Sequence, residues 1–376
     1  MLRKRLAGVV LALALTAGSP AVAEAAAADG GSAASVLWEA YPESAVHPGN
    51  GAGDPRVMDV AVDAPSTGEL LTTVRLLLPR GWSRDARRTW PTLWMLHGGG
   101  GDHKQYTESS HIAEMAAERD VIVVMPETSP CSSYTDWYNG GRGGTPRWEE
   151  YLTRDLPRLL ESRYRAGTER AVLGLSMGGG GALSLAARNP GHFRAVAALS
   201  PESHTLYKAP GLGFSGPDFV KLGALACSKG GEKTDWRRIW GEPGYPFDTF
   251  DPADVRQRAV WAASNPYDIA EGLRGTRLYL TYGNGDGSAG PGWDWNGGNP
   301  PPVPASRCSD PTAAGTDDLG VEKAFWAMNN LFRARLAGLG IPAEVCSATG
   351  THSWPYWDRE IHYALPMLVG ALDQAG

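Results

Sequence analysis

The chain has 376 residues, of which 42% are hydrophobic and 20% charged, so it is long and apolar enough to bury a full core. Its formal net charge of −6 argues against a nucleic-acid partner, because such partners normally select a basic surface. This charge carries no information about the fold.

The first residues have the pattern of a secretory signal peptide. A basic start at 3–5 precedes an apolar run over 6–15, and an A-x-A cleavage pattern follows at 21–23. We therefore expect a signal peptide over 1–23, with cleavage as late as 27, and a disordered mature N-terminus over 24–35. The apolar run is too short to span a bilayer. The mature protein is expected to be exported, or held at the cell envelope, without an integral membrane segment.

Strand-like apolar runs then alternate with helical patterns. The predicted strands are 57–62 and 70–78, joined by a polar turn, followed by 92–96, 121–125, 171–175, 195–199, 277–282 and 343–348. Several of these runs are continuously apolar, as expected for strands covered on both faces. The alternation predicts a single α/β domain over 36–376 with a mostly parallel sheet and helices on both faces.

Helical periodicity is clear in two places. Trp148, Leu152 and Leu156 share one helical face before Pro157, which is expected to interrupt the helix. Later in the chain an amphipathic stripe repeats at helical spacing, formed by Phe325, Met328, Phe332, Leu336 and Leu339.

The segment 283–318 is rich in Gly, Pro and Asn and carries Trp293 and Trp295 in its middle. A loop of this length inside a compact domain is usually functional or disordered. We expect a substrate-facing lid here, with an ordered surface excursion as the alternative.

A G-x-S-x-G pattern at 174–178 follows a predicted buried strand and opens a helical stretch. In this context the pattern predicts a nucleophile elbow, with Ser176 on a sharp turn that aims its hydroxyl out of the sheet. The glycines on either side are needed because the turn leaves no room for side chains. This motif identifies the α/β-hydrolase fold as the expected architecture.

A serine nucleophile needs a base, and in this fold the chain order is Ser, acid, His. His352 lies in a loop after the last predicted strand, where the fold places its base. His192 follows a helix end and His362 lies inside the terminal helix, so both are expected at the surface. Two acids remain open from the residues alone. Asp286 follows the strand 277–282, and Glu322 lies in the first helical turn after the long loop, where the helix dipole keeps a carboxylate ionised.

The oxyanion of an acyl-transfer intermediate needs two backbone donors. Met177, the residue after the nucleophile, supplies the first, and the glycine-rich run 98–101 after the strand 92–96 supplies the second. The histidines and the aspartate around this run have a spacing that fits no metal-binding helix face, so we expect neither a metal nor another cofactor.

The four cysteines are far apart and show no C-x-x-C spacing, which excludes the common zinc and redox motifs. In an exported protein they predict disulfides, with three possible connectivities, and free buried cysteines are the alternative. We prefer Cys308–Cys346, because this bond would staple the long loop to the strand before His352.

Four sequence blocks, in order, resemble the antigen 85 mycolyltransferases and the related secreted actinobacterial esterases. The blocks are S-Y-T-D-W-Y at 133–138, W-E-E-Y-L at 148–152, G-L-S-M-G at 174–178 and G-T-H-S-W at 350–354, the last followed by Tyr356 and Trp357. The likeness extends from Val57 to the C-terminus. It implies that Glu322 rather than Asp286 is the acid. It also implies Gly99 and Met177 as oxyanion donors and Trp354 as a residue lining the sugar site.

One departure from that family concerns the acceptor. Mycolyltransferases of the family carry an acidic residue and an Arg around the oxyanion loop, where they contact the sugar, and His97 and Gly100 stand at these positions here. We expect His97 to contact the substrate. The resemblance therefore supports the acyl-enzyme chemistry of the family more strongly than its use of trehalose as acceptor. We expect short- or medium-chain esters to be hydrolysed, with little stimulation by trehalose.

The sequence thus predicts a secreted serine esterase or acyltransferase with the triad Ser176, His352 and Glu322, acting on a small-molecule or glycolipid acyl ester. The alternative is a cell-wall or ligand-binding protein that keeps the fold without the activity. The acyl chain, the choice between water and a sugar as acceptor, and the oligomeric state stay open at this stage.

Overall fold

The structure, a computed structural model, describes residues 33–41, 56–208, 216–229, 232–242, 252–288, 290–292, 307–316 and 320–373. The predicted signal peptide and most of the predicted N-terminal tail lie outside these residues. So do Trp293 and Trp295, on which the expectation of a lid depends. From Ala33 onwards the chain belongs to one compact unit.

A mixed sheet crosses this unit, with the strand order β1-β2-β3-β5-β4-β6-β7-β10-β11 among the described residues. Pairing is antiparallel from β1 to β5 and parallel along the run β5-β4-β6-β7-β10-β11. The strands are β1 (Ser35–Ala40), β2 (Val57–Asp63), β3 (Thr72–Leu77), β4 (Trp90–Leu96), β5 (Ile122–Pro126), β6 (Ala166–Leu175), β7 (Ala195–Leu199), β10 (Arg277–Gly283) and β11 (Glu344–Ala348), with a separate hairpin of β8 (Ser228–Lys229) and β9 (Glu232–Lys233).

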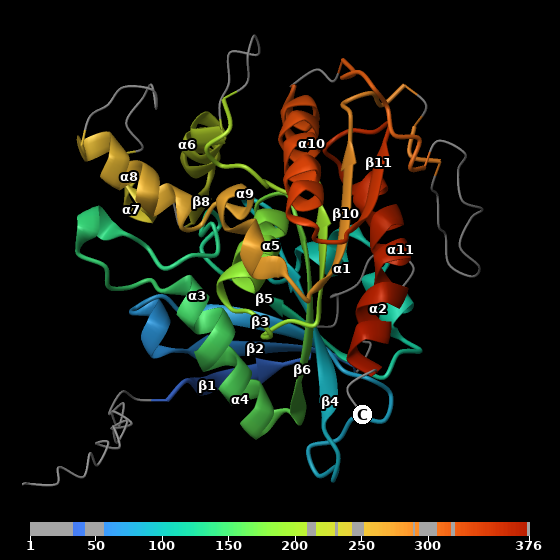
Figure 1. The fold of residues 1–376 in the computed structure, drawn as a ribbon. Helices are drawn as coiled ribbons and strands as arrows, with labels where there is room; N and C mark the ends of the chain where they lie inside the picture. Colours follow the sequence, from blue (N-terminus) through green and yellow to red (C-terminus); the bar gives the residue numbers. More distant parts are fainter. Residues whose placement is uncertain are drawn as a thin grey trace, which may run out of the picture. The chain divides into compact units, whose positions relative to one another are not determined.

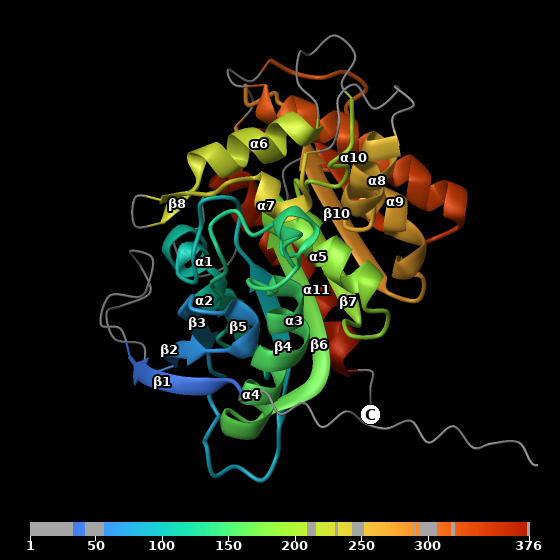
Figure 2. The same ribbon diagram turned by 90° about the vertical axis from the view of Figure 1, so that its left-hand side faces the viewer.

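Helices cover both faces of the sheet, as Figures 1 and 2 show. One core joins one face of the sheet to α1 (Gln105–Ser109), α2 (Ile112–Ala116) and α11 (Trp354–Asp373). A second core joins the opposite face to α3 (Trp148–Glu150), α4 (Leu156–Arg163), α5 (Met177–Arg188) and α10 (Val321–Leu339). The remaining helices are α6 (Gly216–Ala226), α7 (Arg237–Trp240), α8 (Pro252–Ala262) and α9 (Pro266–Ile269). The predicted α/β-hydrolase architecture is confirmed.

The predicted strands all occur, with ends shifted by a few residues. The largest shift is in β6, which begins at Ala166 rather than at 171. β3 begins at Thr72 rather than at 70, because Leu70 and Leu71 are exposed at 46% and 60% and lie outside the ladder. β1 was not predicted. It begins at Ser35, inside the segment expected to be disordered, and its mostly exposed residues give no alternating apolar pattern.

The prediction that Pro157 interrupts the helix is wrong. The helical run continues from α3 through a π-helical turn (Tyr151–Asp155) into α4, which ends at Arg163. A proline ring removes one donor and clashes with the carbonyl four residues earlier. Here that carbonyl belongs to Thr153 in the wider π turn, where the hydrogen-bonding pattern already departs from the α-helix.

The amphipathic stripe at helical spacing is confirmed in α10, where Phe325, Met328, Phe332 and Leu336 are buried. Within the described ranges, every helix is either too short or too polar to cross a membrane. The parallel strands β6, β7, β10 and β11 end at one edge of the sheet, so the residues that follow them gather there.

Candidate active site

The turn between β6 and α5 has the geometry of a nucleophile elbow. Ser176 has φ 54° and ψ −122°, a conformation that is costly for a residue with a side chain and persists only where the surroundings impose it. A Cβ at Gly174 would lie 2.0 Å from the carbonyl oxygen of Gly178, and a Cβ at Gly178 would lie 2.1 Å from that of Leu96. Both glycines of the motif are therefore required by close backbone contact.

The three residues expected to form a triad lie in one hydrogen-bonded chain. His352, on the loop between β11 and α11, places its Nε2 2.9 Å from Ser176 Oγ. Its Nδ1 lies 2.6 Å from Glu322 Oε2, and Glu322 is completely buried in the first turn of α10. The rings of Phe325 and Trp357 contact the His352 ring at centroid distances of 4.6 and 4.8 Å and fix its plane.

The other carboxylate oxygen of Glu322 has two further donors. Oε1 accepts from the Ser200 hydroxyl at 2.7 Å and from the Gly283 amide at 2.6 Å. The Trp357 indole N–H in turn donates to Ser200 Oγ at 3.2 Å. The two hydrogen bonds to Oε1 hold the Glu322 carboxylate in place against His352.

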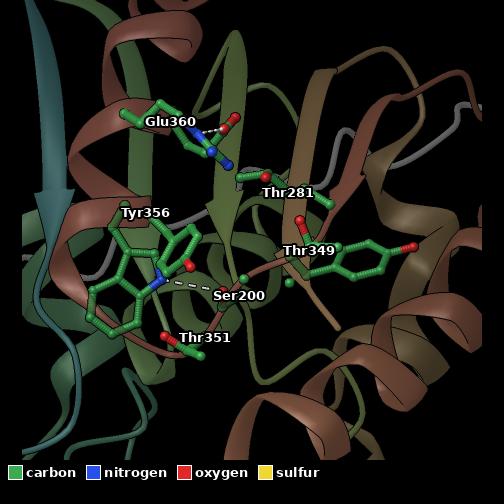
Figure 3. Close-up of a pocket in the computed structure, with 12 residues that line it drawn as sticks. Ser200, Thr281, Thr349, Thr351, Tyr356 and Glu360 are labelled. Carbon is green, nitrogen blue, oxygen red and sulfur yellow. Dashed lines mark hydrogen bonds and ion pairs between the residues drawn. The ribbon is translucent and has the colours of Figure 1, made fainter. Parts of the chain in front are cut away.

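The sequence analysis did not predict that Ser200 and Trp357 belong to this hydrogen-bond network. Trp357 belongs to the block around His352 that carried the family resemblance. Ser200 follows β7 without any motif, and its position beside Glu322 depends on the pairing of β7 with β10. Figure 3 shows Ser200 and its bond to the indole at the wall of a small cavity behind the His352 loop.

Asp286 is placed away from His352. It lies in a turn after β10, where its Oδ1 accepts from the Ser288 amide at 2.9 Å and its own amide donates to Asn284 Oδ1 at 3.0 Å. Hydrogen bonds from Ser288 lower the pKa of the Asp286 carboxyl. The sequence left two acids as candidates. The structure places Glu322 against His352, whereas Asp286 forms hydrogen bonds within its own turn.

The glycine-rich loop after β4 leaves one amide without an acceptor. Gly98 N–H donates to Gln105 Oε1 at 2.9 Å, Gly100 N–H to the Pro130 carbonyl at 2.8 Å and Gly101 N–H to the Gly98 carbonyl at 3.0 Å. Within the part of the chain that the structure describes, the Gly99 amide and the Met177 amide have no protein acceptor. These are the two donors expected for an oxyanion.

His97 lies elsewhere than expected. It is 1% exposed, and both ring nitrogens are used inside the protein: Nδ1 donates to the Gly98 carbonyl, and Nε2 accepts from Thr128. Burial lowers the pKa of the imidazole, which favours the neutral ring. Because its ring is enclosed and hydrogen-bonded to Gly98 and Thr128, His97 stabilises the glycine-rich loop from inside the protein instead of contacting a substrate.

Trp354 is the first residue of α11 and is partly exposed, two positions after His352. Its ring packs edge-on against Tyr106 at 5.6 Å and Trp357 at 5.5 Å. It therefore lies near His352 with one part of its surface open, a position that a substrate-lining residue would need.

Two disulfides flank the site. The preferred pair, Cys308–Cys346, is present and joins the long loop to β11. Cys131–Cys227 joins the end of α6 to the residue after Pro130, whose carbonyl holds Gly100. The second bond thus braces the glycine-rich loop.

Comparisons with known proteins find esterases and acyltransferases. A family model described as putative esterase matches residues 69–368. An esterase of Mycobacterium tuberculosis is 28% identical over 286 residues, which are 74% of this chain and 52% of that protein. The chain thus spans about half the length of this relative. The diacylglycerol acyltransferase/mycolyltransferase Ag85B of Mycobacterium leprae is 29% identical over 293 residues, 75% of this chain and 76% of the relative.

Solved structures share the fold at lower identity. An S-formylglutathione hydrolase from Agrobacterium tumefaciens superposes with a TM-score of 0.58 at 17% identity, covering 90% of this chain and 99% of its own. MPT51 of Mycobacterium tuberculosis also gives a TM-score of 0.58, at 19% identity, covering 83% and 97%.

Proposed function

Because the chain belongs to the putative esterase family, we propose that it is a secreted serine esterase that forms an acyl-enzyme on Ser176. The hydrogen-bonded chain from Ser176 Oγ through His352 to Glu322 is the observation that carries this proposal. The two disulfides support export, since such bonds persist in oxidising compartments.

Acylation begins when Ser176 Oγ attacks the ester carbonyl carbon and its proton passes to His352 Nε2. Glu322 stabilises the resulting imidazolium through Nδ1. The carbonyl oxygen becomes an oxyanion, which the unpaired amides of Gly99 and Met177 bind. The intermediate then collapses: the bond to the alcohol oxygen breaks, and the alcohol leaves with the proton from His352.

Deacylation repeats these steps with a second nucleophile. Water or a sugar hydroxyl gives its proton to His352 and attacks the acyl carbon, and Ser176 regains its proton as the leaving group. All steps up to the acyl-enzyme are common to hydrolysis and transfer. The proposed role of Trp354 is to line the side of the site from which the acceptor enters.

We favour water as the acceptor. The positions that hold a charged pair around the oxyanion loop in mycolyltransferases hold His97 and Gly100 here. His97 is enclosed, and burial lowers the pKa of its ring, which favours the neutral form. No charged sugar contact can come from either residue. Two contacts of charged groups to hydroxyls contribute roughly 1.5–3 kcal/mol each, so a large part of trehalose affinity is absent.

The test supplies 4-nitrophenyl butyrate with increasing trehalose and measures free butyrate against butyryl-trehalose. Free acid should dominate at millimolar trehalose, with turnover little changed. If acyl-sugar formation dominates, hydrolysis is not the main reaction, and the protein is a mycolyltransferase-like acyltransferase instead.

A further inference from the structure

Glu202 is a buried carboxyl group beside the nucleophile that the mechanism does not use. It lies on the loop after β7, and its backbone N–H donates to the carbonyl oxygen of Ser176 at 3.1 Å. A Cβ at Gly180 would lie 2.7 Å from the Glu202 carbonyl oxygen and 3.3 Å from its Cβ. The loop therefore crosses the first turn of α5, directly beside the elbow.

The Glu202 carboxyl group has no partner among the described residues. The residue is 9% exposed, and neither a hydrogen bond nor an ion pair reaches its side chain. Burial raises the pKa of this carboxyl to about 8, with no charged neighbour opposing the shift. Leaving a buried polar group unpaired destabilises a protein, so this residue costs stability without any compensating contact in the described part of the fold.

A small part of Glu202, 9% of the residue, remains exposed. The buried hydroxyls of Ser203 and Thr205, on the same loop, also lack partners but are completely enclosed. The carboxyl oxygens of Glu202, unlike these two hydroxyls, are not completely enclosed. In open parallel sheets ligands bind in the crevice outside the carboxyl ends of the strands, and β6 and β7, which carry Ser176 and Glu202 just past their ends, are neighbours there.

The geometry points to Glu202 as a specificity-determining residue that hydrogen-bonds a hydroxyl group of the ester substrate. This inference rests on the proposed esterase function. A hydroxyl group both donates and accepts, and an uncharged carboxyl group matches it in both roles. A substrate ammonium group would instead require an ionised carboxylate, which burial disfavours.

The test compares wild type with Glu202→Leu and Glu202→Gln on matched esters. One pair, 4-nitrophenyl butyrate and 4-nitrophenyl 3-hydroxybutyrate, places the hydroxyl on the acyl part. A second pair, ethyl butyrate and glycerol monobutyrate, places hydroxyls on the alcohol part. The ester 4-nitrophenyl 4-aminobutyrate supplies an ammonium group. Ser203→Ala is the matched control, since it removes an unpaired hydroxyl from the next position.

For Glu202→Leu we expect kcat/KM to fall about tenfold on the hydroxylated ester of one pair, and less than about twofold on its parent ester. Glu202→Gln should keep most of the selectivity, and Ser203→Ala all of it. The Leu variant should also melt at a higher temperature, because an unpaired buried carboxyl is removed.

Equal losses on parent and hydroxylated esters, or no loss on either, would overturn the assignment. Selective loss on the ammonium ester would overturn the hydroxyl as the group recognised. A failure of the proposed function itself looks different: wild type would then hydrolyse none of the esters and would not react with a fluorophosphonate probe.

Discussion

Replacing Glu322 by Gln tests the geometry of the acid directly. One carboxylate oxygen accepts from two donors, the Ser200 hydroxyl and the Gly283 amide, and the other lies 2.6 Å from His352 Nδ1. A Gln side chain has a single acceptor oxygen, which should turn toward the two donors. Its NH2 group then faces the imidazole, so Nδ1 must become an acceptor and the ring proton must move to Nε2.

An imidazole protonated at Nε2 cannot take the proton of Ser176. The loss expected from this wrong tautomer is about 10⁴-fold in kcat, or about 5 kcal/mol of transition-state stabilisation. Asp286→Asn is the matched control, since Asp286 bonds only within its own turn among the described residues. Its kcat/KM should stay within about twofold of wild type.

The assay is kcat and KM on 4-nitrophenyl butyrate for both variants, with melting temperatures to establish that each is folded. If Asp286→Asn proves the crippling change and Glu322→Gln retains activity, the assignment of the acid is refuted.

Further predictions concern the surroundings of the site. Ser200→Ala removes one bond to the Glu322 carboxylate and should lower kcat about tenfold with KM unchanged, while Ser203→Ala changes neither; a KM effect instead would contradict a positioning role. Replacing both Cys131 and Cys227 by Ser opens a loop of sequence separation 96 and should cost roughly 4 kcal/mol in urea unfolding, with kcat lowered because the Pro130 brace of Gly100 is lost; unchanged kcat would contradict the brace. The raised pKa of Glu202 gives a stability effect with a definite sign. Between its ordinary value of 4.5 and about 8 the unfolded chain loses the proton while the folded protein keeps it, so stability falls as pH rises through this window. Glu202→Gln should remove that part of the decline, as measured by urea unfolding at about pH 5 and pH 8; parallel wild-type and variant curves would refute it.

Local sequence patterns predicted the parts of the site that local geometry controls. The glycines at 174 and 178 are required by backbone contacts within the elbow and with Leu96, so the motif alone located Ser176. The position of His352 followed from its place after the last strand. Most of the sheet's strands could be predicted because they are buried on both faces and therefore form apolar runs in the sequence.

Residue positions that depend on contacts between distant parts of the chain could not be predicted from the sequence. Glu322 and Asp286 both follow β10 in the chain, and the residues alone could not decide which carboxylate reaches His352. The decision depends on where α10 packs against β10, a tertiary contact. His97 was misplaced for a related reason: a polar residue at the start of a glycine-rich loop gives no sign that its ring turns inward toward Thr128. Glu202 carries no local signal, because its burial is created by the fold.

The proposed mechanism depends above all on Ser176 being a nucleophile activated by His352. The most direct measurement is labelling with a fluorophosphonate probe, followed by intact mass and peptide mapping of wild type and Ser176→Ala. We expect a single adduct on Ser176 in wild type, none in the variant, and a loss of ester hydrolysis on the order of 10⁴-fold or more in the variant. A wild-type protein that does not react, or a Ser176→Ala variant that is still labelled, would contradict it.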